Sequence, residues 1–191
     1  MPTRRDGTEP KITHGLVFLR PAEKADLPLF VTWFNDHALT RTLGMRSPMS
    51  LAMEEQWFDR VVADQGKTGY HFVACRIEDD RPVGVTGLHD LDQLNGTAGL
   101  GISVGAAADR GQGYGTDMLR ALLRFGFDSL RLERIWLEVF EYNPGARRLY
   151  ERVGFVFEGT SRHAIFFEGR HRDVDRLSIL REEWEALRPQ P

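Results

Sequence analysis

Three alternating glycines, Gly111, Gly113 and Gly115, constrain this chain more than any other feature. They lie between a segment with strand character, residues 98–104, and a helix whose leucines recur at spacings of three and four residues. Glycines in such a place permit unusual dihedral angles, close backbone approach and exposed amide groups. The N-terminus of the helix adds partial positive charge, so the loop suits a phosphate or pyrophosphate. A glycine-rich turn that only lets strand and helix pack would also fit the glycines alone.

Three phosphate-binding patterns compete for these residues. The dinucleotide pattern G-x-G-x-x-G fails, because Thr116 stands where it requires glycine. Gly66-Lys67-Thr68 resembles the end of a P-loop, but Val61 takes the place of that motif's first glycine. The third pattern, Arg/Gln-x-x-Gly-x-Gly/Ala, fits residues 110–115.

This third pattern resembles the one found in the GNAT acetyltransferase superfamily. Residues 143–155, NPGARRLYERVGF, resemble that superfamily's Asn-x-x-Ala-x-x-Leu-Tyr-Glu-x-x-Gly-Phe segment. Upstream, residues 33–36 and 55–58 are similar to the ribosomal-protein N-terminal acetyltransferase (RimJ/RimL) branch. Residues 167–174 resemble that branch and the related spermidine N-acetyltransferases. The resemblance covers roughly residues 16–185, nearly the whole chain.

The expected fold is a single α/β domain, with residues 1–15 as a flexible tail and residues 16–191 as the N-acetyltransferase domain. A length of 191 residues suits one domain. The resemblance implies a mixed, mostly antiparallel sheet that is flanked by helices and splays open at its centre, between the strands at 98–104 and 134–141. Hydrophobic patterns predict the further strands 16–20, 70–77, 83–88, 155–167 and 172–180, and helices at 26–36, after Ser50, after Thr116, and at 144–153 and 182–188.

The resemblance also implies how acetyl-CoA, the expected co-substrate, would bind in that gap. The pantetheine arm would pair with the backbone of the strand that ends at Val104, and Asn143 would hydrogen-bond the same arm. The pyrophosphate would lie on the amides of the glycine loop, with Arg110 preceding it. The expected phosphate-cradle residues are Gly111, Gln112, Gly113, Tyr114, Gly115 and Thr116.

The resemblance implies that Tyr150 stands near the thioester sulfur, which makes it the expected catalytic residue. It follows Asn143 by seven residues, so both lie on one side of the predicted helix. A phenol has a pKa of about 10 and a thiol of about 8.5, so Tyr150 could hydrogen-bond or protonate a departing thiolate. The alternatives are that Asn143 only caps the helix and that Tyr150 only packs in the core.

The general base is not evident from the sequence. The related branch often has a glutamate at the position of Gly99, where this chain has no side chain. His89, Asp90, Asp92 and Glu138 are substitutes, although each also fits a surface or salt-bridging role. Deprotonation relayed by water is a further alternative, so no base is assigned.

The leading hypothesis is an acetyl-CoA-dependent N-acetyltransferase in which a primary amine attacks the thioester directly in a ternary complex. The amine belongs to a protein N-terminus, a polyamine, an amino acid or an aminosugar, carried by a small molecule or a peptide. The resemblance implies that residues 35–50 and 166–172 flank the cleft, so they are the expected acceptor side. The competing hypothesis is a non-catalytic acyl-CoA-binding sensor on the same scaffold.

Composition excludes or disfavours several other kinds of partner and site. A net charge of -3 disfavours nucleic acid as a partner. The single cysteine, Cys75, excludes an intramolecular disulfide, and the scattered histidines predict no metal site. Apolar stretches are too short to span a membrane and no signal segment is evident, so we expect no membrane partner and a cytoplasmic protein. Relatives suggest a homodimer.

Overall fold

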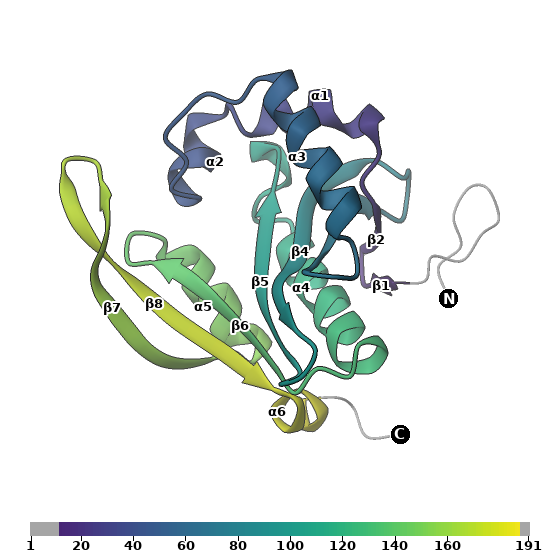
Figure 1. Ribbon diagram of the computed structural model, residues 1–191, viewed down its shortest axis with the longest axis vertical. Coiled ribbons are helices and arrows are strands. Elements are labelled where there is room, and N and C mark those ends of the chain that lie inside the picture. The colour runs from purple at the N-terminus through teal and green to yellow at the C-terminus, as the bar shows by residue number, and fades with distance from the viewer. Residues whose placement is uncertain (1–11, 188–191) are drawn as a thin grey trace.

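The computed structural model describes residues 12–187, and they form one eight-stranded sheet with helices on both faces (Figure 1). The strand order is β1-β2-β3-β4-β5-β6-β8-β7. All neighbouring strands are antiparallel except β5 and β6. The strands are β1 (Ile12–His14), β2 (Val17–Pro21), β3 (Tyr70–Arg76), β4 (Pro82–Asp92), β5 (Thr97–Val104), β6 (Arg134–Phe140), β7 (Val156–Phe167) and β8 (Arg170–Leu180).

Helices connect these strands and cover the sheet. The α-helices are α1 (Leu27–Trp33), α2 (His37–Thr42), α3 (Leu51–Asp64), α4 (Tyr114–Arg124), α5 (Pro144–Val153) and α6 (Arg181–Ala186). In Figure 1, α4 and α5 lie behind the sheet, and α1 and α3 lie in front of it. No helix among residues 12–187 is long and apolar enough to cross a membrane.

The sheet splays open at its one parallel pair, as predicted. β5 pairs with β6 only where Thr97–Gly99 meets Arg134–Trp136. Beyond those residues the two strands diverge (Figure 1). The β6-facing edge of β5 from residue 100 onward is therefore not paired within the sheet, and its backbone groups are available to a ligand.

Side-chain alternation along the strands produces two cores. On β2, Val17 and Leu19 join the core beneath α4, whereas Phe18 joins the core beneath α1 and α3. On β3, Ala74 joins the core beneath α4 and Cys75 joins the core beneath α1 and α3. This two-sided burial fixes the register, because a slip of one residue would exchange the two faces.

Three details differ from the predictions. The tail predicted for residues 1–15 is too long, because Ile12–His14 pair with β2; residues 1–11 lie outside the described part of the chain. The short helix α2 was not predicted. The sequence predicts Asp26 as the N-cap of α1, but this residue makes no capping bond, because its carboxylate accepts two hydrogen bonds of 2.7 Å from Arg20.

Helix α3 begins as predicted, since the Ser50 hydroxyl accepts a hydrogen bond from the Met53 amide. The sequence predicts an apolar face of Met53, Trp57, Phe58, Val61 and Val62, and the structure buries only part of it. Phe58 and Val61 are buried, but Met53 and Val62 are exposed, and Glu54 is buried instead. The apolar residues of this helix were too numerous for one face, and packing against α1 selects among them.

Candidate active site

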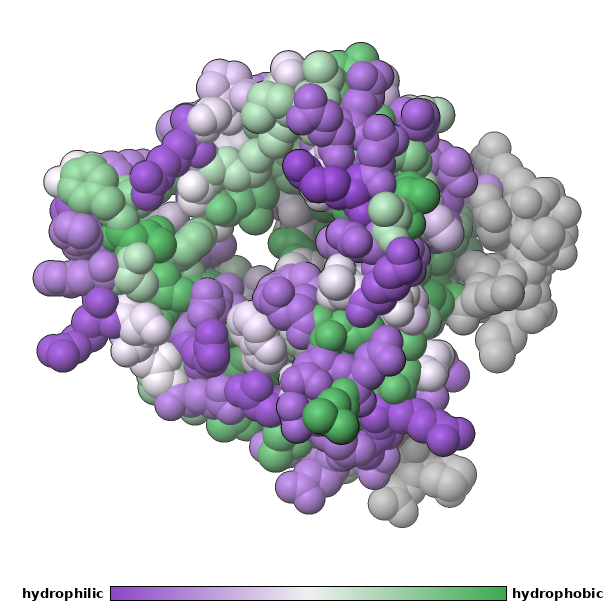
Figure 2. All heavy atoms as spheres, viewed as in Figure 1, coloured by the Kyte–Doolittle hydropathy of each residue, from purple (hydrophilic) through white to green (hydrophobic). Residues whose placement is uncertain are grey.

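A cleft of about 740 Å³ opens where β5 and β6 separate. Figure 2 shows the hollow in the middle of this face of the molecule. The strands β5 and β6, the glycine loop, α2 and α5 all contribute to its walls. Eight of the predicted site residues line it: Val104, Arg110, Gly111, Gly113, Gly115, Thr116, Asn143 and Tyr150.

The glycine loop has the conformation that the sequence predicted. Gly111 and Gly113 have φ angles of 78° and 92°, in the left-handed region that disfavours side chains. Gly113 is the N-cap of α4. A side chain at Gly115 would instead press against Leu149, 3.3 Å from its Cβ position, so this glycine allows α4 and α5 to pack closely.

The amides of this loop are available to an anion. The N–H groups of residues 111–115 donate to no acceptor in the described part of the chain. Free amides at the start of an α-helix form an anion site, to which the helix dipole adds. The amide of Thr116 is different, because it donates to the Gly113 carbonyl at 3.0 Å. Gln112 and Tyr114 do not line the cleft, so their free backbone amides are the one feature of these two residues that suits an anion.

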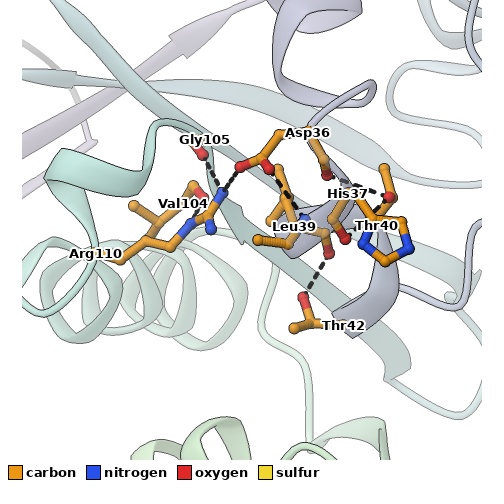
Figure 3. A network of polar contacts seen from close by, with 9 residues as sticks. Asp36, His37, Leu39, Thr40, Thr42, Val104, Gly105 and Arg110 are labelled. Carbon is orange, nitrogen blue, oxygen red and sulfur yellow. Dashed lines mark hydrogen bonds and ion pairs between the residues drawn. The ribbon is translucent and has the colours of Figure 1, made fainter.

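Arg110 lines the cleft, but its guanidinium is already engaged (Figure 3). It donates to Asp36 and to the Gly105 carbonyl, both at 2.7 Å. Asp36 also caps α2, by accepting from the Ala38 amide at 3.0 Å. Hydrogen bonding to Arg110 lowers the pKa of Asp36. The arginine therefore joins the glycine loop to α2, a contact that the sequence did not reveal.

Asn143 and Tyr150 both lie on α5 or at its start, and both line the cleft. The Asn143 carbonyl oxygen Oδ1 caps the helix by accepting from the Ala146 amide at 3.2 Å. Its Nδ2 group has no partner among the described residues, so capping and ligand binding are compatible. The Tyr150 side chain is buried beside Phe155, with ring centroids 5.9 Å apart.

Burial raises the pKa of Tyr150 to about 12. The phenol is therefore protonated at neutral pH, which is the form that can donate a hydrogen bond. Complete proton transfer to a thiolate, whose conjugate acid has a pKa of about 8.5, is uphill from such a phenol. This environment favours hydrogen-bond donation to a departing sulfur over full protonation.

A second cavity, of about 230 Å³, adjoins the cleft, and we call it the inner cavity. The two share Leu43 and the β5 residues Gly101, Ile102 and Ser103. Gly101 has open space where a side chain would stand. The other inner-cavity residues include Phe30, Phe34, Trp57, His71 and His89. Phe34 and Trp57 lie in the segments 33–36 and 55–58 that carry the family resemblance, and His89 was a candidate base. No sequence motif indicated Phe30 or His71, or that all five residues meet, because they come from separate parts of the chain.

A third cavity, of about 590 Å³, is lined by nine residues of the segment 34–48, which do not include Asp36, and by Phe166–Glu168. We call it the vestibule. These are the segments that were expected to flank the acceptor. It shares Phe34 with the inner cavity. Within it, Arg41 and Glu168 form a two-point ion pair with distances of 2.6 and 2.9 Å.

The candidate bases differ in their hydrogen-bond partners and in whether they line a cavity. Glu138 lines the cleft but pairs with Arg176 at 2.8 Å. Asp92 holds a turn through two hydrogen bonds to Asn95. His89 lines the inner cavity, and its Nδ1 lies 2.9 Å from an Asp90 oxygen.

The acetyltransferase (GNAT) domain family matches residues 17–156 of the chain. The chain belongs to this family. It is therefore an N-acetyltransferase, and the predicted fold and family are confirmed. No group of three or more metal-ligating side chains occurs among residues 12–187.

Individual relatives span most of the chain. An uncharacterized N-acetyltransferase of Bacillus subtilis, YokL from the SPbeta prophage, is 29% identical over 167 residues, which cover 87% of this chain and 91% of the relative. A putative ribosomal N-acetyltransferase, YdaF, from the same organism is 35% identical over 103 residues, 54% of this chain and 56% of the relative. The crystal structure of Vibrio cholerae spermidine N-acetyltransferase in complex with CoA and spermine superposes with a TM-score of 0.82 at 26% identity, covering 89% of this chain and 98% of that one.

Proposed function

We propose that this protein transfers the acetyl group of acetyl-CoA to a primary amine by direct attack in a ternary complex. The observation that carries the proposal is the meeting of two cavities at Gly101–Ser103 of β5. The cleft holds the features suited to a CoA thioester, and the inner cavity offers a separate approach for an acceptor. The solved relative that binds CoA and spermine supports the same pairing of ligands.

The residues present fit acetyl-CoA. The pantetheine arm would lie along the unpaired edge of β5 that ends at Val104, and Asn143 would donate to it through Nδ2. The pyrophosphate would accept from the free amides of residues 111–115. In this assignment, Arg110 and Thr116 shape the loop through their own hydrogen bonds.

The chemistry requires a C–N bond to form and a C–S bond and an N–H bond to break. The neutral amine nitrogen attacks the thioester carbonyl carbon, the C–S bond breaks with its electron pair leaving on sulfur, and the nitrogen releases one proton to a base or to water. Tyr150 donates a hydrogen bond to that sulfur. No enzyme nucleophile is needed, and Cys75 is buried in the core beneath α1 and α3, away from the cleft.

Two measurements test the proposal. CoA should raise the melting temperature, since a ligand at a hundredfold excess over its dissociation constant stabilises the native state by about 2.7 kcal/mol. Acetyl-CoA and a broad panel of amines, peptides included, should then release free thiol. CoA binding without thiol release from any amine would instead support the acyl-CoA sensor.

Three finer assignments stay predictions. The YdaF match and residues 33–36 and 55–58 support the RimJ/RimL-like branch. A homodimer is testable by sedimentation of the purified protein. A cytoplasmic location is testable by cell fractionation.

A further inference from the structure

We infer that the preferred acceptor is a primary amine carried on an uncharged, aromatic-sized apolar group, and not a polyamine. This inference rests on the proposed function and narrows its substrate class. It follows from the walls of the two acceptor-side cavities.

The inner cavity has apolar walls without a formal charge. Of its fourteen lining residues, none is Asp, Glu, Lys or Arg. Aromatic rings dominate, with Phe30 and Trp57 packed edge to face at 6.1 Å and Trp57 and His71 at 5.9 Å. Burial lowers the pKa of His71, which favours the neutral form of this ring. Such a wall binds an apolar group by burying its surface away from water. It offers no hydrogen-bonding or charged partner to the second ammonium group of a polyamine.

The vestibule also lacks a free carboxylate. Its one acidic residue, Glu168, is held by Arg41 and approached by Arg172 at 3.8 Å. Arg46 lines the same cavity and donates to the Phe166 carbonyl, with no carboxylate partner among residues 12–187. The formal charges lining the vestibule therefore sum to a positive value. A polyamine, which carries several ammonium groups, would meet repulsion on this route.

The volume of the inner cavity sets the size of the apolar group. About 230 Å³ is below the range of pockets for drug-sized ligands, roughly 300–1,000 Å³. A single ring on a short chain has a size that matches this volume. The acceptor is thus an arylalkylamine or the N-terminus of a peptide whose first residue is aromatic.

Thiol-release kinetics with matched amines test this inference. We expect kcat/KM for 2-phenylethylamine to exceed that for ethylamine and for spermidine by about tenfold or more, on the scale of burying one apolar side chain. Phe-Gly-Gly against Ser-Gly-Gly distinguishes the peptide source from the small amine. Equal or better turnover of spermidine would overturn the inference. The absence of thiol release with every amine would instead contradict the proposed function.

A pair of variants makes the test specific. Phe34 lies in the wall between the inner cavity and the vestibule. Phe34→Glu should move the ratio of kcat/KM values toward spermidine, whereas Phe34→Leu should keep the apolar preference. An unchanged ratio in a folded Phe34→Glu protein would contradict the inference.

A different observation supports a second proposal, that His89 is the general base. His89 lies opposite Gly99 in the β4–β5 register. A Cβ on Gly99 would stand 2.3 Å from Cε1 of the His89 ring. Glycine at position 99 therefore makes room for the imidazole, which lines the inner cavity beside the shared β5 residues.

The local backbone orients this ring. A bulge interrupts β4 between His89 and Asp92, and Asp90 has a φ angle of 48°. The Asp90 carboxylate lies 2.9 Å from Nδ1 of His89. When Nδ1 carries the proton and donates it in a hydrogen bond to this carboxylate, Nε2 is the ring nitrogen that can accept a proton. Nε2 has no partner among the described residues. In the reaction it would take one proton from the attacking nitrogen as the C–N bond forms, while the leaving sulfur receives a hydrogen bond from Tyr150.

His89→Gln should lower kcat by about a hundredfold, within the 10²–10⁴ range of general-base catalysis, with CoA-induced stabilisation unchanged. The titratable groups around His89 are Asp90 on β4 and His71 on β3, and Trp136 on β6 meets the ring at 5.4 Å. The acidic limb of the pH profile should therefore vanish in His89→Gln and persist in His71→Gln.

Asp92→Asn is the matched control, because Asp92 shares the bulge but only holds the turn at Asn95. It should keep the wild-type pH profile and kcat. A decrease in kcat of less than about threefold in a folded His89→Gln protein would overturn the assignment. A shift of the acidic limb of the pH profile in His71→Gln would overturn it as well.

Discussion

At the scale of single residues, Tyr150 offers the most direct prediction. Tyr150→Phe keeps the ring and its packing against Phe155 and removes only the hydroxyl. Since general acid assistance is worth about 10²–10⁴ in rate and a raised pKa weakens the acid, we expect a loss of kcat near the low end of that range. Steady-state kinetics with a thiol-release readout measure it.

The affinity for acetyl-CoA should change little in the same variant, because the hydroxyl acts on the leaving sulfur in the transition state. Loss under about threefold would leave Tyr150 as a packed aromatic, provided that product release does not limit turnover.

The raised pKa of Tyr150 also predicts a pH dependence of stability. A phenol whose pKa is about 12 when folded and about 10 when unfolded favours the folded state fully below pH 10. That contribution is lost as the pH rises toward 12. Urea unfolding between pH 9 and 12 should therefore show a shallower decline in Tyr150→Phe than in the wild type. Equal slopes would show that the phenol is more hydrated than its burial indicates.

At the scale of elements, the glycine loop and α4 act as one unit. Gly113→Val should weaken CoA-induced stabilisation, because Gly113 caps α4 at a φ of 92° and a β-branched residue is strained there by about 1–3 kcal/mol. The displaced backbone would turn the free amides away from the cleft. Thermal shift with CoA measures the effect.

Gly159→Ala is the control for that prediction. Gly159 lies in β7, has no positive φ and would meet no atom within 4 Å through an added Cβ. It should keep the full thermal shift. A folded Gly113→Val protein that binds CoA as the wild type does would contradict the phosphate-cradle assignment.

Most residues that line the cleft, and the segments that line the vestibule, were predictable from the sequence, whereas the inner cavity was not. The glycine loop, Asn143 and Tyr150 lie within short motifs whose spacing places them at helix N-termini or on one helix face. The inner cavity gathers Phe30, Trp57, His71 and His89 from four elements, and no spacing in the sequence records such a contact. The link from Arg110 to Asp36 spans 74 residues and depends on α2, which is only six residues long.

At the scale of the whole molecule, that link joins the two halves of the site. Asp36 caps α2, whose residues Leu39 and Thr42 line the cleft, and Arg110 precedes the glycine loop (Figure 3). Asp36→Ala and Arg110→Ala should each raise both the KM for the amine and the dissociation constant of CoA, because either change frees α2 from the loop. The lowered pKa of Asp36 means that the ion pair with Arg110 persists above the carboxyl's unfolded pKa, about 3.9, and weakens as the pH falls below it.

A double-mutant cycle measures the coupling between Asp36 and Arg110: the double variant should be no worse than the more impaired single variant. Additive losses would mean that the two side chains act separately, with Arg110 serving the cofactor directly and Asp36 only capping α2.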